Sequence, residues 1–165
     1  MKNSYTINET VCTIEVVQRN GTKHAVFIDT SDLPKLQGYN VSVNKHGTGF
    51  CAIITKPGES HYLHRFLSSA PSDMEVDHED GNALNNVTTN RRIVTHAQNQ
   101  QNRKLNSNSY SGIRGVSWDT RAGKWRANVT LNKKMHWLGF FDDLPAAEKA
   151  VTAFRKLHMP FSKEV

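Results

Sequence analysis

The chain has 165 residues, 37% of them hydrophobic, which is sufficient for one domain or a few small ones with folded cores. Its formal net charge of +6 and pI near 9.4 favour a polyanionic partner such as nucleic acid. No run reaches the roughly 18 apolar residues of a membrane span, the N-terminus has no apolar signal core, and Cys12 and Cys51 have neither disulfide-framework nor zinc-site spacing. We therefore expect an intracellular protein that is not secreted, contacts no membrane and binds no structural zinc.

Residues 1–57 are expected to form a small β region. Three runs rich in β-branched and aromatic residues are bounded by Asp, Pro or Gly: residues 25–30, 39–44 and 49–56. The next run, residues 61–67, suits either a strand or the start of a short helix, and its pattern does not separate the two.

The next segment is expected to pass from a long ordered loop into a strand and a helix. Residues 77–90 are rich in asparagine and have no apolar period, which is typical of a loop. Residues 91–94 suit a short strand. Thr95 suits the N-cap of a helix over residues 96–104, because its hydroxyl can accept from the first free amides.

A boundary between two domains is expected near Leu105. The Ser- and Asn-rich run around it has few apolar residues, which is typical of a linker or loop. Most of the positive excess and all three tryptophans lie downstream of it. The sequence therefore predicts an N-terminal domain over residues 1–105 and a C-terminal domain over residues 106–165.

The C-terminal domain is expected to be a three-stranded antiparallel sheet packed on one helix. Its strand-like runs are separated by turn-like segments and cover residues 112–118, 123–132 and 134–141. After Asp142 and Asp143, which suit a helix cap, apolar residues recur at helical spacing. Taken with the N-terminal β region, this predicts an α+β fold.

Asp77 and His78 stand side by side where an expected strand meets the loop. Neighbouring strand residues point to opposite sides of the pleat, so the carboxylate could hold a cation while the imidazole takes a proton from a water aimed at a phosphate. Oxygen ligands suit Mg²⁺ or Mn²⁺, and Asn99 in the following helix is placed to add an amide oxygen. A lone Asp-His pair is usually a chance surface dipeptide, but here a loop and a helix accompany it.

The pattern V-D-H-x-D-G-N-x-L-x-N, followed by N-x-R-x-x-T-x-x-x-N-x-x-N, resembles the HNH nucleases, specifically the phage and intron-encoded homing endonucleases with a ββα-metal site. With the LHRFL run upstream, the resemblance covers about residues 62–103. It implies that Asp77 and Asn99 bind a divalent cation, most often Mg²⁺ and otherwise Mn²⁺. It also implies that His78 is the general base and that Asn86 pins the loop.

Two positions depart from this family's pattern. Asn85 stands where Asp is common and still supports a turn, whereas Arg91 stands where Leu is common and places a charge at a usually apolar site. His64 is expected to be a packed, hydrogen-bonded histidine rather than a second base. Beside a phosphodiesterase site, five cationic side chains are expected to contact the DNA backbone: Arg65, Arg91, Arg92, Arg103 and Lys104.

The C-terminal runs SGIRGVSWD, GKWRANV, WLGFFD and AAEKA resemble the ethylene-response-factor type of DNA-binding domain, over about residues 111–158. The resemblance implies that one face of the sheet enters the DNA major groove. The residues expected to contact DNA are Arg114, Arg126, Asn128, Thr130 and Trp137, of which Arg126 is added as a neighbour on the same face. Several arginines of the plant pattern are replaced here, so the plant target sequence does not transfer.

Together these resemblances imply a metal-dependent endonuclease that nicks or cleaves double-stranded DNA, as a monomer or a homodimer. The alternative is a DNA-binding regulator with a degenerate, inactive nuclease motif, and the presence of Asp77, His78 and Asn99 favours the enzyme. A nuclease or binder directed to RNA is a third reading. A sheet face that reads the major groove suits duplex DNA better than A-form RNA.

Overall fold

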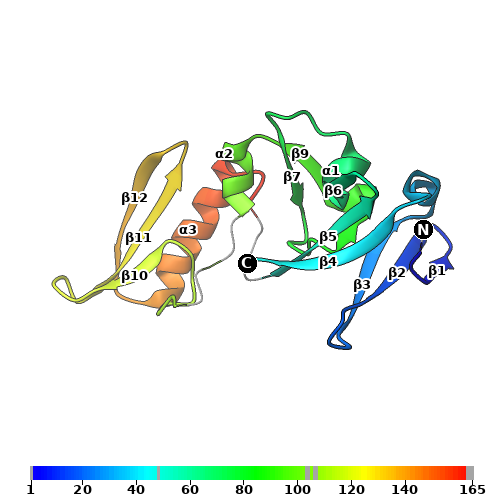
Figure 1. Cartoon of the computed structure of the whole chain (residues 1–165). Coiled ribbons are helices and arrows are strands. Elements are labelled where there is room, and N and C mark those ends of the chain that lie inside the picture. The colour runs from blue at the N-terminus through cyan, green and yellow to red at the C-terminus, as the bar shows by residue number, and fades with distance from the viewer. Residues whose placement is uncertain (1, 48, 103–104, 106–107, 163–165) are drawn as a thin grey trace. The chain divides into compact units, whose positions relative to one another are not determined.

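The computed structural model of the chain describes residues 2–47, 49–102, 105 and 108–162. The chain forms two compact units, Met1–Thr95 and His96–Val165 (Figure 1). The first is mainly β-sheet and the second is a sheet with one long helix, so the expected α+β class is confirmed. No described helix is long and apolar enough to cross a membrane. The domain boundary near Leu105 stays a prediction.

The first unit contains two sheets, a two-stranded ribbon and short helices. The four-stranded sheet has the order β1-β2-β3-β8, with β1 at Tyr5–Asn8, β2 at Val11–Val17, β3 at Lys23–Asp29 and β8 at Asn85–Asn86. The three-stranded sheet is antiparallel and consists of β4 (Asn40–His46), β5 (Gly49–Lys56) and β6 (Glu59–Tyr62). The ribbon pairs β7 (Glu75–His78) with β9 (Arg91–Val94). The helical segments are η1 (Thr30–Leu36), α1 (Leu63–Ser68) and η2 (Thr88–Asn90).

One apolar core joins the two sheets and α1. Strand β2 alternates strictly, so Cys12, Ile14 and Val16 are buried while the residues between them face outward. The sequence prediction omitted both β1 and β2, although this alternation marks β2. The segment left open between strand and helix contains both: residues 61–62 end β6, and α1 begins at Leu63. Leu63 and Leu67, four residues apart on α1, both enter this core.

Part of the expected loop after His78 pairs with the four-stranded sheet. Within it, β8 pairs in parallel with β3, with Asn86 opposite Ile28. Asp29 at the end of β3 accepts from the backbone amide and the hydroxyl of Thr88, at 2.8 and 2.5 Å. These contacts fix the loop at both its middle and its end.

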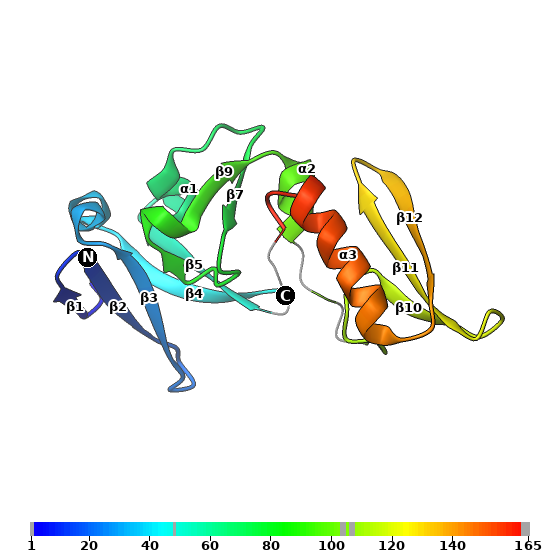
Figure 2. The ribbon, with the colours of Figure 1, turned by 180° about the vertical axis from the view of Figure 1, so that it is seen from behind.

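The second unit is a three-stranded antiparallel sheet with α3 across one face, as Figure 2 shows. Its elements are α2 (His96–Asn99), η3 (Gln100–Asn102), β10 (Val116–Asp119), β11 (Lys124–Leu131), β12 (Lys134–Phe141) and α3 (Leu144–His158). Helix α3 begins as expected, with the Asp143 carboxylate accepting from the amide of Ala146 at 2.7 Å. The helix expected over residues 96–104 is shorter, because α2 tightens into a 3₁₀ turn after Asn99.

Gly115 allows a close approach between the loop before β10 and strand β11. Its φ is +86°, and a Cβ at this position would collide with the carbonyl oxygen of Asn128. The amide of Asn128 in turn donates to the Gly115 carbonyl at 2.9 Å, beside the bulge between Ala127 and Asn128. A side chain here would therefore have to displace backbone rather than a flexible side chain.

We expect Gly115→Ala to lower the free energy of unfolding of the second unit by about 3 kcal/mol, from backbone strain and overpacking together. Gly123→Ala is the matched control: its φ is also positive, at +63°, but nothing lies within 4 Å of the added Cβ. That control should cost only about 1 kcal/mol. All three tryptophans lie in the second unit, so denaturant unfolding followed by tryptophan fluorescence reports on it selectively. Equal losses in the two variants would contradict the close approach.

Candidate functional site

The loop between β7 and β9 is held by side-chain amides. Asn90 is buried; its amide group donates to Asp80 at 2.9 Å and to the Asn85 carbonyl at 2.7 Å, and its oxygen accepts from the Asp80 amide. The Asp80 carboxylate also accepts from the Asn82 amide at 2.7 Å and the Asn85 side chain at 2.8 Å. Burial would raise the pKa of Asp80, but these donors hold it below its usual range. The loop is therefore ordered by its own polar residues.

Asn86 orients the ring of His78. His78 is 7% exposed and Asn86 is fully buried, and the Nε2 of His78 lies 3.3 Å from the Oδ1 of Asn86. The Nδ2 of Asn86 donates to the Ala83 carbonyl at 3.3 Å, which turns its oxygen toward the histidine. Because an amide oxygen only accepts, this assigns the proton to Nε2 and leaves Nδ1 as the basic nitrogen.

The surroundings of His78 also keep it neutral. Burial lowers the pKa of His78 by more than the Asn86 hydrogen bond and the charges of Asp80 and Asp77 raise it. An imidazole that is neutral at physiological pH can accept a proton. The described geometry thus gives His78 the protonation state and the tautomer that a general base requires.

His64 packs against His78 from helix α1. The two ring centroids are 5.2 Å apart and the rings are nearly perpendicular, at 83°. Burial first, and then the nearby His78, lower the pKa of His64 to about 4, so it is neutral as well. Its Nδ1 is buried and has no hydrogen-bond partner among the described residues, in contrast to the hydrogen-bonded histidine expected from the sequence. The packing itself is as expected.

Asp77 lies opposite Arg92 in the β7–β9 ribbon, and the two side chains form an ion pair of 2.5 Å. The carboxylate is 9% exposed on its side chain and the guanidinium 22%. Burial of an ionised carboxylate is favourable only with a compensating cation, which Arg92 supplies here. Arg92 therefore pairs with Asp77 in the ribbon, and its expected phosphate contact stays a prediction.

The donor set suits a hard divalent cation. Asp77 offers a buried carboxylate. Asn99, the last residue of α2, belongs to the second unit, and its role as a metal ligand stays a prediction. Among the described residues no group of three or more His, Cys, Asp or Glu side chains could hold a metal. A Mg²⁺ site usually has only one or two carboxylate ligands from the protein, and water and phosphate oxygens complete it.

Arg91 turns inward, and its expected phosphate contact stays a prediction. Its side chain is 5% exposed and donates to Asp32 at 3.0 Å and to the hydroxyls of Ser68 and Thr88, each at 3.1 Å. Asp32 is itself 7% exposed on its side chain, so the pair is buried. The charge at this usually apolar position is therefore neutralised inside the fold, and its guanidinium has almost no surface with which to meet DNA.

Of the other expected phosphate contacts, the structure describes Arg65 but not Arg103 or Lys104. Arg65 donates to three backbone carbonyls, those of Ala70, Pro71 and Met74, and so ties the segment after α1 to the helix. That placement supports a structural role, with its DNA contact remaining a prediction. The last two expected contacts, Arg103 and Lys104, lie outside the described residues.

The second unit presents one open sheet face opposite α3. Ala127 and Val129 point into the core with α3, so the residues that alternate with them face away. Cross-strand pairs on that face join Arg126 to Phe140, Asn128 to Trp137 and Thr130 to Met135. Four of the expected DNA contacts, all but Arg114, therefore come together on one surface: Arg126, Asn128, Thr130 and Trp137.

Two exposed aromatic rings mark this open face. Trp137 is 50% exposed and Phe140 45% exposed, and their ring centroids are 4.9 Å apart. Trp118 and Trp125 instead contact one another at 5.1 Å on the core side of the sheet. Phe140 was not among the residues expected on this face. Phe140 lies opposite Arg126 because of the register between β11 and β12, which its residue type alone does not indicate.

Comparison with known proteins places the nuclease motif within a family. Residues 68–101 match the sequence profile described as HNH endonuclease. Protein 3.8 of Escherichia phage T7 is 32% identical over 93 residues, which cover 56% of this chain and 77% of that protein. A protein of Acanthamoeba polyphaga mimivirus, named as an uncharacterized HNH endonuclease, is 34% identical over 98 residues, covering 56% of this chain and 48% of that protein. No solved structure matches the chain significantly.

We expect Arg91→Met to destabilise the first unit by roughly 3 kcal/mol, because it leaves the buried Asp32 without its buried cation. Lys35→Met is the matched control, since Lys35 contacts the same carboxylate at 2.7 Å but its side chain is 55% exposed. That exposed contact should be worth less than about 1 kcal/mol. Hydrogen exchange of the β7 and β9 amides measures both. Similar effects of the two variants would rule out a buried structural pair.

Proposed function

Because the chain belongs to the HNH endonuclease family, we propose that it is a divalent-metal-dependent, homing-type endonuclease that hydrolyses phosphodiester bonds in double-stranded DNA. The observation that carries the proposal is the state of His78. Its ring is buried beside a buried carboxylate and held by Asn86, with Nδ1 left basic. A neutral, oriented histidine next to a hard oxygen donor suits metal-assisted hydrolysis.

In the proposed reaction the Nδ1 of His78 takes a proton from a water molecule that attacks the phosphorus. Asn86 keeps the opposite ring nitrogen protonated and so holds the base in one tautomer through the step. Asp77 and Asn99 would hold the divalent cation, Mg²⁺ or Mn²⁺, which stabilises charge on the phosphate and on the leaving 3′ oxygen. Asp77 would then exchange its ion pair with Arg92 for the cation, leaving Arg92 able to approach the phosphate.

We further propose that the second unit supplies DNA affinity and site choice, in the manner of an ethylene-response-factor-type domain. The open face of its sheet supports this, since it combines Arg126 with polar side chains and two exposed aromatic rings. Cations add affinity through the phosphates, while polar and aromatic groups can read or stack on bases. Arg114, in the loop before β10, would contact DNA beside this face. One motif per chain predicts that a monomer nicks one strand and that a double-strand break needs a homodimer.

We expect His78→Ala to reduce cleavage of supercoiled plasmid in Mg²⁺ by roughly 10²-fold or more while leaving DNA affinity nearly unchanged. His61→Ala is the matched control, because the His61 side chain is 46% exposed and contacts Glu59 and Phe66 rather than Asp77, His78 or Asn86. It should cleave like the unmodified protein. Cleavage by the His78 variant at the full rate, or cleavage in excess chelator, would overturn the mechanism. DNA binding without cleavage by the unmodified protein would favour an inactive DNA-binding regulator instead.

The DNA-binding role of the sheet face predicts that Arg126→Ala weakens DNA binding and lowers the slope of log affinity against log salt by about one, the effect of one lost phosphate contact. Arg121→Ala removes the same charge from the exposed β10–β11 turn and serves as the control. Electrophoretic mobility shifts at several salt concentrations measure both slopes. Equal slopes in the two variants would count against the face as the DNA contact.

A further inference from the structure

The open face of the second unit's sheet has one polar strand and one apolar strand. Across it, β11 presents Arg126, Asn128 and Thr130, and β12 presents Phe140, Trp137 and Met135 directly opposite them. The three β12 side chains are all exposed, Met135 the most at 64%. A globular domain usually scatters its exposed apolar side chains, and neighbouring ones on one face mark a binding surface. The β12 side of the face is therefore a candidate for an apolar contact.

The core of the second unit does not explain these three side chains. From β12, that core takes Leu138 and Phe141, which pack against its buried residues. Trp137 and Phe140 instead contact one another, with ring centroids 4.9 Å apart and rings at 80°. Met135 lies next to Trp137 on the same face, two residues along the strand. Apolar surface that the fold leaves in water favours transfer to an apolar group of a ligand.

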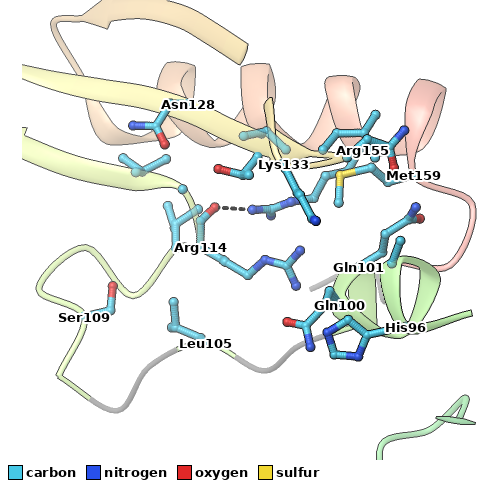
Figure 3. Close-up of a pocket in the computed structure, with 18 of the residues that line it drawn as sticks. His96, Gln100, Gln101, Leu105, Ser109, Arg114, Asn128, Lys133, Arg155 and Met159 are labelled. Carbon is cyan, nitrogen blue, oxygen red and sulfur yellow. Dashed lines mark hydrogen bonds between the residues drawn. The ribbon is translucent and has the colours of Figure 1, made fainter. Parts of the chain in front are cut away.

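Hydrogen bonds hold the backing of this face in place. Arg155 of α3 donates to the backbone carbonyl of Arg114, in the loop before β10, as Figure 3 shows. Gly115 in the same loop accepts from the amide of Asn128 at 2.9 Å, beside the bulge of β11. The loop is thus fastened both to α3 and to β11. A bulge increases the local twist, and a fixed one presents the side chains of the face in a set arrangement that loses little entropy on binding.

The major groove of B-DNA accepts a two-stranded β-ribbon and presents a methyl group at one base alone. Adenine, guanine and cytosine are read there by their hydrogen-bond donors and acceptors, whereas thymine adds a 5-methyl group. Phosphates attract cations and give an apolar side chain nothing to bind. Arg126 on the same face and the net charge of +6 favour a polyanion. The apolar side of the face therefore suits the one methyl group that DNA offers.

We propose that Met135 contacts the 5-methyl group of thymine in the major groove, with Trp137 and Phe140 beside it excluding water from the contact. The chain then selects duplex sites that have thymine at a fixed position. This inference rests on the proposed DNA-binding role of the second unit and adds to it the base that is read. It makes Met135 a residue that determines specificity, whereas Arg126 adds affinity through the phosphates.

Selection of binding sites by the full chain from a random duplex pool, in chelator, tests the proposal without cleavage. We expect thymine to be enriched at one or more fixed positions. Each such thymine is then replaced, one at a time, by deoxyuridine, which lacks only the 5-methyl group. At the position that Met135 contacts, affinity should fall about fourfold, the effect of one buried carbon group.

Met135→Gln should abolish this fourfold difference, because a polar amide replaces the apolar contact at an exposed position that accommodates it. The change in the deoxyuridine effect between the variant and the unmodified chain measures the coupling of Met135 to the methyl group. Leu157→Gln is the matched control, since Leu157 is 76% exposed but lies on α3, across the other face of the sheet. It should keep the full difference.

Equal affinity of the unmodified chain for thymine and deoxyuridine sites would overturn the proposal and leave the DNA-binding role of the second unit standing. A deoxyuridine effect that persists in full in Met135→Gln would overturn the assignment to Met135. Tighter binding of single strands than of duplex would place the aromatic rings on unstacked bases and overturn the major-groove contact. A chain that binds no DNA would refute the DNA-binding role and this inference together.

Discussion

The buried ion pair between Arg91 and Asp32 is the contact on which the arrangement of the first unit depends. It joins η1, which follows the four-stranded sheet, to β9, which carries Arg91 directly opposite His78. The same guanidinium also donates hydrogen bonds to Ser68, the last residue of α1, and to Thr88 in η2. A leucine at this position would leave Asp32 without its buried partner, so the arginine that departs from the family pattern is accommodated by a buried carboxylate elsewhere in the chain.

Burial of polar groups gives the nuclease motif its chemistry. His78, Asn86 and Asn90 are all at most 7% exposed, and such groups are tolerated only where hydrogen bonds replace water. The side-chain amides of Asn86 and Asn90 supply these hydrogen bonds in the loop. The bond from Asn86 also determines which nitrogen of His78 is basic. The same burial keeps His78 neutral and leaves Asp77 in need of a cation. The order of the loop and the protonation state of His78 thus share one physical origin, which would also favour the proposed cation at Asp77.

The two units differ in the charge at their candidate sites. In the first, a buried carboxylate is neutralised by Arg92 and suits a divalent cation. In the second, the open sheet face carries the cation Arg126 beside polar and apolar side chains. The formal net charge of +6 on the whole chain favours a polyanionic partner. The open sheet face is the surface of the second unit that we propose for contact with DNA.

The sequence by itself determined the α+β class, the strands and helix of the second unit, and the motif that places the chain among the HNH endonucleases, because periodicity and fixed spacing are local properties of the chain. It did not reveal β1 as a strand, because β1 has only four residues and all of them are exposed. Nor could it show that Arg91 turns inward, because its partner Asp32 is 59 residues away. The tautomer of His78 and the exposed pairing of Phe140 with Arg126 likewise arise only when distant segments meet. The sequence gives the chemical type of each side chain, but burial and charge compensation depend on which residues the fold brings together.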